Sequence, residues 1–468
     1  MTGVSEVSFG SSLALFSAAS VLLALIIEAM HKRRKIWAIP ALLVYATVGG
    51  WYFGDLIYYG VEEFELQFGP TLTSRALLQV TLFLISYRIF VQLLLPRKND
   101  PRAHDDVAAC FSQITVERFF YLLCAVWCAL FVAGLARADW DVLAILWPPT
   151  SQLKVSMFAT TGVGAGIDFL ISAANYIYIL ICALFGVILV LARGPVRVFA
   201  LFMIALSWPY FWFDRIRNVM LAILLPGVFC YWVTTRRALW QKLVVSLILL
   251  ALVNVWFLQV MRYRSSAEAS MEDLLDFSSG EGGQHLGLDM LSELCWMNFL
   301  RDAGLYSPAW GARYFAEIAQ VVPRSFWPGK PMLGIDYTIA RGFGAVNESD
   351  AANAAGVYAS VATGMIGQGV ANFGAIFGVV AAALLMALWT KVLGQLWRRR
   401  FEFMRFLLFA VGCGLTFNMG RDITLLVLWP FAFGYVCVFL LEQIQSARDR
   451  RARPSRQPMA LDLNGMHP

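Results

Sequence analysis

The chain has 468 residues, of which 59% are hydrophobic and only 15% are charged, and its mean hydropathy is +0.65. This composition excludes an ordinary soluble domain and is typical of a helical protein that crosses a membrane many times. The net charge of +6 does not indicate nucleic-acid binding, because the basic residues cluster at the ends of apolar runs.

Apolar runs long enough to cross a bilayer core, which takes roughly 20 residues in a helix, recur along the sequence. We therefore predict an all-α, polytopic membrane protein with about eleven transmembrane helices. The predicted spans are 11–30, 36–60, 71–95, 119–136, 168–193, 198–212, 218–235, 242–261, 365–396, 404–419 and 424–445. They divide the chain into a bundle of eight spans (1–261), one large polar segment (262–364), three further spans (365–446) and a basic tail (447–468).

Clusters of basic residues set the predicted orientation. They occur in every second loop, for example at Arg97 and Lys98, at Arg236 and Arg237, and in the run 398–400. Loops rich in Lys and Arg stay in the cytoplasm, so the remaining loops are expected on the opposite side. We thus expect an outside N-terminus, a cytoplasmic C-terminus and a segment 262–364 that lies entirely outside.

Two amphipathic helices are predicted inside the large outside segment. Apolar residues recur at helical spacing over 286–300, which predicts the first helix. Ser307 and Pro308 have the residue types of an N-cap and a first helical position, so the second helix is expected from about 308 to 322.

The stretch 321–336 is expected to be a stiff, irregular loop. Pro323, Pro328 and Pro331 each lack an N–H and fix φ, and they hold Arg324 and Lys330 between them. A rigid cationic loop beside a bilayer suits a lipid-linked phosphate. The alternative is a structured connector whose charges contact only water and lipid headgroups.

Cationic residues in several outside turns are predicted to meet at one membrane face. Arg suits a diphosphate, because its planar guanidinium makes two charge-assisted hydrogen bonds and keeps its proton. The alternative for each is local ion pairing, such as Arg421 with Asp422. The predicted diphosphate or substrate ligands are Arg215, Arg217, Arg262, Arg264, Arg324, Lys330, Arg341 and Arg421.

A general base is also required if a hydroxyl group attacks a substrate at this face. Four outside residues, Asp214, Glu281, His285 and Asp336, are candidates among which spacing does not choose. We expect no cofactor and no metal, and the pair Asp139 and Asp141 is interpreted as a solvated helix end. The glycine-rich run 364–369 is interpreted as a close-packing helix face and not as a nucleotide site.

Three stretches resemble the Wzy-type oligosaccharide repeat-unit polymerases. They are PRSFWPGKP at 323–331, MIGQGVANFGAIFG at 365–378 and, more weakly, DRIRNVML at 214–221. The resemblance implies a GT-C-like glycosyltransferase of the bacterial inner membrane that acts at its periplasmic face. Such an enzyme transfers a growing glycan from one undecaprenyl diphosphate to a repeat unit on another, for O-antigen or a related polysaccharide, and works beside a chain-length regulator.

Two other functions remain open from the sequence. An O-antigen ligase-type transferase would use similar arginines with a different acceptor. A flippase or transporter for lipid-linked glycans would favour inverted repeats and charges at all membrane depths, whereas the charges here gather at one face.

Overall fold

The computed structural model describes residues 8–95, 107–146, 158, 167–208, 217–265, 288–319, 322, 326–327, 329, 335–342, 361–423 and 425–452. This part of the chain forms helices and contains no strand. The all-α prediction is therefore confirmed.

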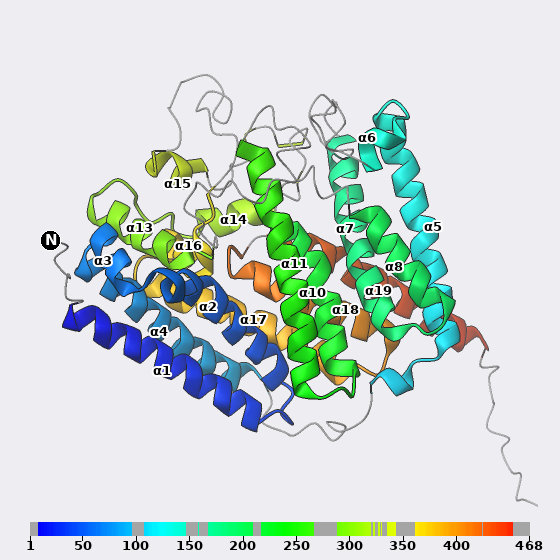
Figure 1. Ribbon diagram of the computed structural model, residues 1–468, viewed down its shortest axis with the longest axis horizontal. Coiled ribbons are helices and arrows are strands. Elements are labelled where there is room, and N and C mark those ends of the chain that lie inside the picture. The colour runs from blue at the N-terminus through cyan, green and yellow to red at the C-terminus, as the bar shows by residue number, and fades with distance from the viewer. Residues whose placement is uncertain are drawn as a thin grey trace, which may run out of the picture.

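The described helices are shown in Figure 1, and those before residue 266 come first. In chain order they are α1 (Phe9–His31), α2 (Ala38–Tyr59), α3 (Val61–Phe68), α4 (Pro70–Leu94), η1 (Ala108–Cys110), α5 (Gln113–Arg137), α6 (Val142–Leu146), α7 (Ile167–Leu191), α8 (Pro195–Ser207), α10 (Arg217–Thr234) and α11 (Leu239–Ser265). The second half contributes α13 (Met290–Asp302), α14 (Ala312–Ala319), α15 (Ile335–Ala340), α16 (Gly364–Phe373), α17 (Phe377–Arg398), α18 (Phe403–Met419) and α19 (Leu425–Ala452).

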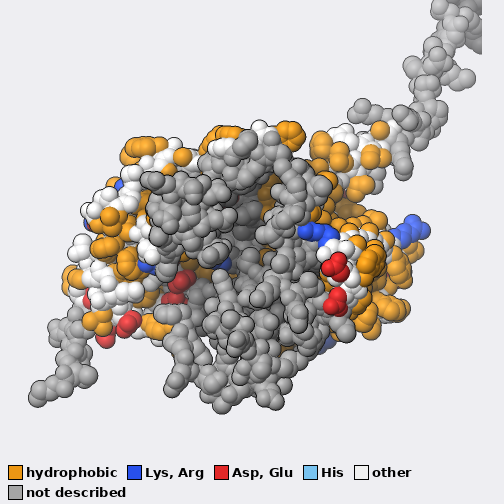
Figure 2. Space-filling view, turned by 90° about the horizontal axis from the view of Figure 1, so that it is seen from above, with side chains coloured by type: hydrophobic (Ala, Val, Ile, Leu, Met, Phe, Trp, Pro, Cys, Tyr) orange, Lys and Arg blue, Asp and Glu red, His pale blue; other side chains and the backbone are white. Residues whose placement is uncertain are grey.

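Five of the described helices are long and apolar enough to cross a membrane. They are Phe9–His31, Pro70–Leu94, Gln113–Arg137, Ala173–Leu191 and Phe377–Arg398. Large apolar side chains on α1 are exposed instead of packed, among them Phe9 at 82% and Phe16 at 71%, and Figure 2 shows hydrophobic side chains around the rim of the described surface. Soluble proteins rarely expose so many large apolar side chains together. The exposed apolar side chains and the long apolar helices therefore indicate a multi-pass membrane protein. Shorter apolar helices fall within other predicted spans, and the total of eleven stays a prediction.

The predicted span 365–396 is not one continuous helix. Gly374 ends α16 with a φ of +87°, and α17 begins three residues later. The two helices then cross so closely that a Cβ on Gly369 would lie 2.2 Å from the carbonyl oxygen of Gly378. This contact confirms that the small residues form a close-packing face, and it also explains the break, because the chain must reverse to bring both glycines together.

Helices from the two ends of the sequence pack against each other. α4 lies against α1 and α17, while α18 contacts α2, α10, α17 and α19. A buried hydrogen bond of 2.7 Å joins Tyr87 on α4 to Thr390 on α17. The helices near the C-terminus are therefore packed into the bundle against those near the N-terminus.

The described helices α13, α14 and α15 of the large polar segment gather above α16 at one end of the bundle (Figure 1). The helices predicted over 286–300 and 308–322 correspond to α13 and α14. The predicted start of the second helix is wrong, because α14 begins at Ala312 and not at Pro308. Trp310 and Gly311 adopt left-handed backbone conformations, and the N–H of Ala309 donates to the carbonyl of Ala371 on α16, so tertiary contact outweighs the local capping signal.

Candidate functional site

The turn between α18 and α19 places Asp422 against the start of α16. The Oδ1 atom of Asp422 accepts hydrogen bonds from the backbone N–H of Thr363 at 3.3 Å and from its hydroxyl at 3.1 Å. The side chain of Gln368 accepts a hydrogen bond of 3.0 Å from the N–H of the next residue, Ile423, and donates one of 3.2 Å to its carbonyl. Asp422 and the residue after it are thus both hydrogen-bonded to α16 or its N-cap residue.

The backbone just before Asp422 is fixed with equal rigidity. The carbonyl of Gly420 accepts from the N–H of Met365 at 3.1 Å. A Cβ on Gly420 would lie 2.3 Å from the Trp51 ring of α2, so only glycine fits here. Tyr52, the next residue of α2, accepts a hydrogen bond of 2.9 Å from the N–H of Ile366. Three helices, α2, α16 and α18, therefore meet at this turn.

Two arginines flank the Asp422 carboxylate. Arg421 precedes it in the turn, and its guanidinium has no hydrogen bond or ion pair among the described residues. The positive charge of Arg313 acts on the carboxylate from α14, which packs against α16 and α19. The side chain of Arg313 is only 12% exposed, and its Nη1 atom is buried with no hydrogen-bond partner in the part of the chain described. We call Asp422, Arg313 and Arg421 the Asp422 cluster. The unsatisfied Nη1 donor of Arg313 makes this cluster suited to binding an anion.

The electrostatics of the cluster favour a carboxyl group that exchanges its proton near neutral pH. Burial raises the pKa of Asp422 to about 6, although the positive charges of Arg313 and Arg421 and the hydrogen bonds from Thr363 oppose that rise. The pKa of Tyr314, beside Arg313, is raised well above its usual value by burial and by the negative charge of Asp422. Perturbed groups of this kind are concentrated at functional sites.

Asp336, one of the predicted bases, lies on the other side of Arg313. Its Oδ2 atom accepts a hydrogen bond of 2.6 Å from the hydroxyl of Tyr306, and its Oδ1 atom lies 3.7 Å from Nη2 of Arg313. Both carboxylate oxygens are therefore engaged. In this structure Asp336 anchors the Arg313 side chain.

Arg341, one of the predicted phosphate ligands, is paired inside the large polar segment. Its Nη2 atom lies 3.0 Å from Oε1 of Glu293, and its guanidinium stacks 4.1 Å from the centre of the Trp296 ring. The hydroxyl of Tyr337 donates to the same Glu293 carboxylate. These contacts tie α15 to α13.

The other predicted site residues are not placed at the cluster by the structure. Arg217 begins α10, and Arg262 and Arg264 lie in the last turn of α11, but their side chains lie outside the described part. Asp139 and Asp141 follow α5 in a turn where Asp139 and Trp140 have positive φ, and no group of metal-ligating residues is found in the described ranges. Asp214, Arg215, Glu281, His285, Arg324 and Lys330 lie outside the described residues.

Two members of the cluster, Asp422 and Arg313, were not predicted as site residues from the sequence. Asp422 appeared only as the possible ion-pair partner of Arg421, and Arg313 was not singled out. The signal that could have found Asp422 is an acidic residue at the end of an apolar helix, since such residues are costly near a bilayer unless they have a function.

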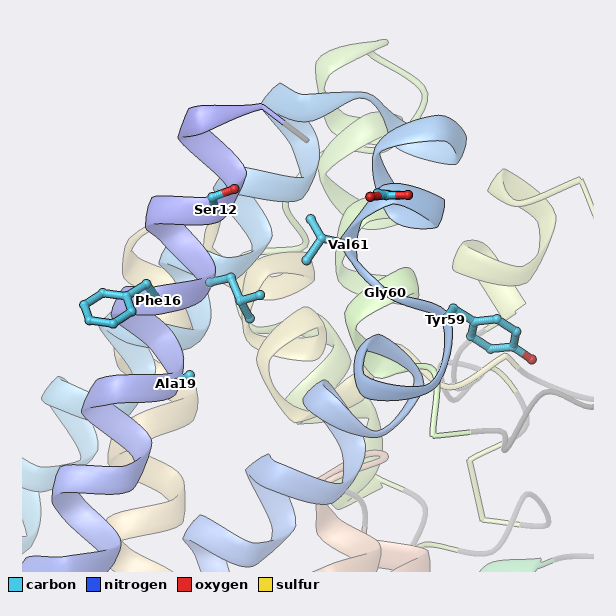
Figure 3. A pocket seen from close by; sticks show the side chains of 8 residues that line it. Ser12, Phe16, Ala19, Tyr59, Gly60 and Val61 are labelled. Carbon is cyan, nitrogen blue, oxygen red and sulfur yellow. The ribbon is translucent and has the colours of Figure 1, made fainter. Parts of the chain in front are cut away.

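A separate groove of about 670 Å³ lies between α1 and the α2–α3 turn. Figure 3 shows Ser12 and Ala19 on α1 at one side of the groove and Gly60 and Val61 at the other, with the ring of Phe16 turned outward. The groove shares no lining residue with the Asp422 cluster, and Phe16 is 71% exposed. It therefore belongs to the apolar outer surface of the bundle.

Comparison with known proteins gives no relative for this chain: no protein-family description, no curated protein and no solved structure matches it.

Proposed function

We propose that the protein is a glycosyltransferase that polymerises oligosaccharide repeat units carried on a polyprenyl diphosphate. The growing glycan leaves one undecaprenyl diphosphate and is joined to a hydroxyl group of the repeat unit on another. In this proposal the chain is a bacterial inner-membrane protein with eleven spans, and the end that carries the large polar segment faces the periplasm.

The observation that carries the proposal is the pairing of Arg313 and Arg421 around a partly buried turn at that end of the bundle. A diphosphate leaving group gains negative charge in the transition state, and fixed guanidinium groups stabilise it without reorganisation. Arg313 has a buried, unsatisfied Nη1 atom, and the backbone that carries Arg421 is fixed because Gly420 and Ile423, on either side of Arg421 and Asp422, are hydrogen-bonded to α16. Both cations are thus positioned before any ligand arrives.

The setting also supports a lipid-linked substrate. The cluster lies at one end of a bundle whose outer surface is apolar, so a polyprenyl tail can stay in the bilayer while the diphosphate reaches the arginines. The resemblance of 323–331 to the polymerase loop would add Arg324 and Lys330 as further phosphate ligands. No cofactor is required for the transfer, because the diphosphate itself is the leaving group.

The proposal is tested with the purified full-length protein in lipid nanodiscs. The substrate is a lipid-linked oligosaccharide fraction extracted from the native host after deletion of the gene. Wild-type protein is expected to yield a ladder of glycan lengths, and Arg313→Ala and Arg421→Ala are each expected to reduce its rate roughly a hundredfold or more.

Arg75→Ala is the matched control, since Arg75 forms an exposed salt bridge of 2.6 Å with Asp302 of the large polar segment. It should leave the ladder unchanged. A wild-type protein that makes no ladder would refute the polymerase, and one that instead transfers glycan to a lipid A core acceptor would be a ligase. Normal ladders from both arginine variants would remove the cluster from the reaction.

A further inference from the structure

The two oxygens of Asp422 have different surroundings. Oδ1 accepts both hydrogen bonds from Thr363. No described residue donates a hydrogen bond to Oδ2, and Asp422 is only partly buried, so this oxygen can be reached by a substrate. Asp336, the other described carboxylate at Arg313, accepts the Tyr306 hydroxyl at Oδ2 and has its charge paired with Arg313 through Oδ1 at 3.7 Å. Of these two carboxylates, Asp422 has an oxygen available for chemistry.

We infer that Asp422 is the general base of the proposed transfer and that its Oδ2 atom takes the proton of the attacking acceptor hydroxyl. This inference rests on the proposed function. As the hydroxyl oxygen forms its bond to the anomeric carbon of the donor glycan, its O–H electron pair becomes available and its proton passes to Oδ2. The bond between the anomeric carbon and the diphosphate oxygen breaks, and that electron pair leaves with the diphosphate.

Proton transfer to Asp422 would also strengthen the binding of the leaving group. Before the reaction, the carboxylate attracts the guanidinium groups of Arg313 and Arg421. Once Oδ2 is protonated, that attraction disappears while the diphosphate gains charge. The two arginines then interact with the diphosphate alone, so the base and the leaving-group site act in the same step.

The charged and titratable groups around Asp422 are consistent with this role. Arg313 and Tyr314 face it from α14, Arg421 precedes it in its own turn, and Tyr52 faces it from α2. Burial raises the pKa of Asp422 to about 6, so the carboxyl is ionised at pH 7 but binds a proton more readily than a solvent-exposed Asp. A base of this strength suits proton abstraction near neutral pH.

Thr363 is the positioning residue of this arrangement. Its backbone N–H and its hydroxyl both donate to Oδ1, which leaves Oδ2 without a hydrogen-bond donor among the described residues. Thr363→Ala removes the hydroxyl donor and keeps the N–H, so the rate should fall about tenfold. Thr363→Ser restores the hydroxyl and should recover most of that loss.

The first experiment measures kcat/KM for chain extension from pH 5 to pH 8 with the lipid-linked oligosaccharide fraction described above. Because kcat/KM reports groups of the free enzyme, the wild-type rate should rise with pH and level off above a pKa of about 6. Asp422→Asn should lower the rate by roughly a hundredfold to ten-thousandfold and should abolish the acidic limb. Asp302→Asn, at an exposed carboxylate of α13, should keep both the rate and the limb.

A binding measurement separates a base from a ligand or a structural residue. Asp422→Asn should bind inorganic diphosphate at least as tightly as wild type, because Arg313 and Arg421 lose a competing negative charge. If Asp422→Asn extends chains at the wild-type rate, or if the wild-type profile has no limb near pH 6, Asp422 is not the base. Failure of the wild-type protein to extend any chain would instead refute the proposed function. If Asp422→Asn does not fold, the wild-type pH profile and the Thr363 variants still test whether Asp422 is the general base.

Discussion

Replacing Glu293 by alanine is expected to destabilise the protein more than replacing its partner Arg341. The two side chains form a salt bridge of 3.0 Å with exposed fractions of 8% and 12%. Glu293 also accepts the hydroxyl of Tyr337, a side chain that is fully buried. Glu293→Ala therefore removes the carboxylate that pairs with Arg341 and also the short hydrogen bond of Tyr337, whose hydroxyl keeps only the backbone carbonyl of residue 293 at 3.4 Å. Arg341→Ala removes the cation but leaves Tyr337 bonded to the carboxylate.

The magnitudes follow from these contacts. Breaking a buried ion pair by removing one partner costs about 3–5 kcal/mol, and loss of the hydrogen bond from Tyr337 to the charged carboxylate adds about 1.5–3 kcal/mol. Arg341→Ala also loses the stacking of the guanidinium on Trp296, at 4.1 Å from the ring centre, which is worth about 1 kcal/mol. The double variant should cost less than the sum of the two single variants, because it leaves no charge unpaired.

The assay can use Cys295, which lies on α13 and is fully buried. Burial raises the pKa of this thiol to about 12, so alkylation requires local or global unfolding. Alkylation of Cys295 during heating in detergent, followed by mass spectrometry, then gives an apparent unfolding temperature for each variant. Arg75→Ala is the control, because its exposed pair with Asp302 should contribute less than about 1 kcal/mol.

The outcome also bears on the predicted role of Arg341 as a phosphate ligand. If Arg341→Ala leaves the unfolding temperature unchanged but abolishes polymerisation, Arg341 binds substrate and the reasoning above fails. If both single variants are destabilised, and the polymer made per folded molecule by Arg341→Ala is normal, the pair is structural.

Two further predictions concern the α16–α17 crossing and the proline-rich loop. Gly378→Ala should destabilise the protein by about 1–3 kcal/mol, because its Cβ would lie 2.1 Å from the carbonyl oxygen of Gly369, whereas Gly367→Ala should be tolerated in the same thermal assay, since its nearest neighbour is at 3.5 Å. In the predicted loop, Arg324→Lys should shorten the glycan products nearly as much as Arg324→Ala, because Lys cannot make a bidentate phosphate contact. Normal ladders from Arg324→Lys would exclude that contact. Lys330→Arg should keep longer products than Lys330→Ala.

The features that the sequence could predict are those set by local pattern. Long apolar runs predict helices whatever their neighbours are, and α1, α4, α5 and α17 are all present. The small residues of α16 predicted close packing, and the contact between Gly369 and Gly378 confirms it. The helical spacing of apolar residues before Leu300 likewise predicted α13, whose apolar face is buried.

The candidate site could not be predicted in the same way, because its contacts join distant parts of the chain. Thr363 and Asp422 are 59 residues apart, and Arg313 approaches Asp422 from a third element. The sequence offered only the adjacent pair, Arg421 and Asp422, and an adjacent pair suggests local neutralisation. In the same way, Ser307 and Pro308 had the residue types of a helix start, but the bond from Ala309 to Ala371 delays the helix, because tertiary contact outweighs a capping preference.

The hydrogen bonds that Asp422 makes with Thr363 do not require its negative charge. An asparagine at this position would still offer Oδ1 to the N–H and hydroxyl of Thr363, and it would avoid the burial of a negative charge. The folded-state pKa of about 6 lies above the ordinary 3.8, so the carboxylate favours unfolding increasingly as the pH rises through that interval. Glu293 differs, since its charge is matched by Arg341 inside the fold. A carboxylate that weakens the fold at neutral pH beside two arginines, one of which has a buried and unsatisfied Nη1 atom, is the arrangement that the proposed proton transfer requires.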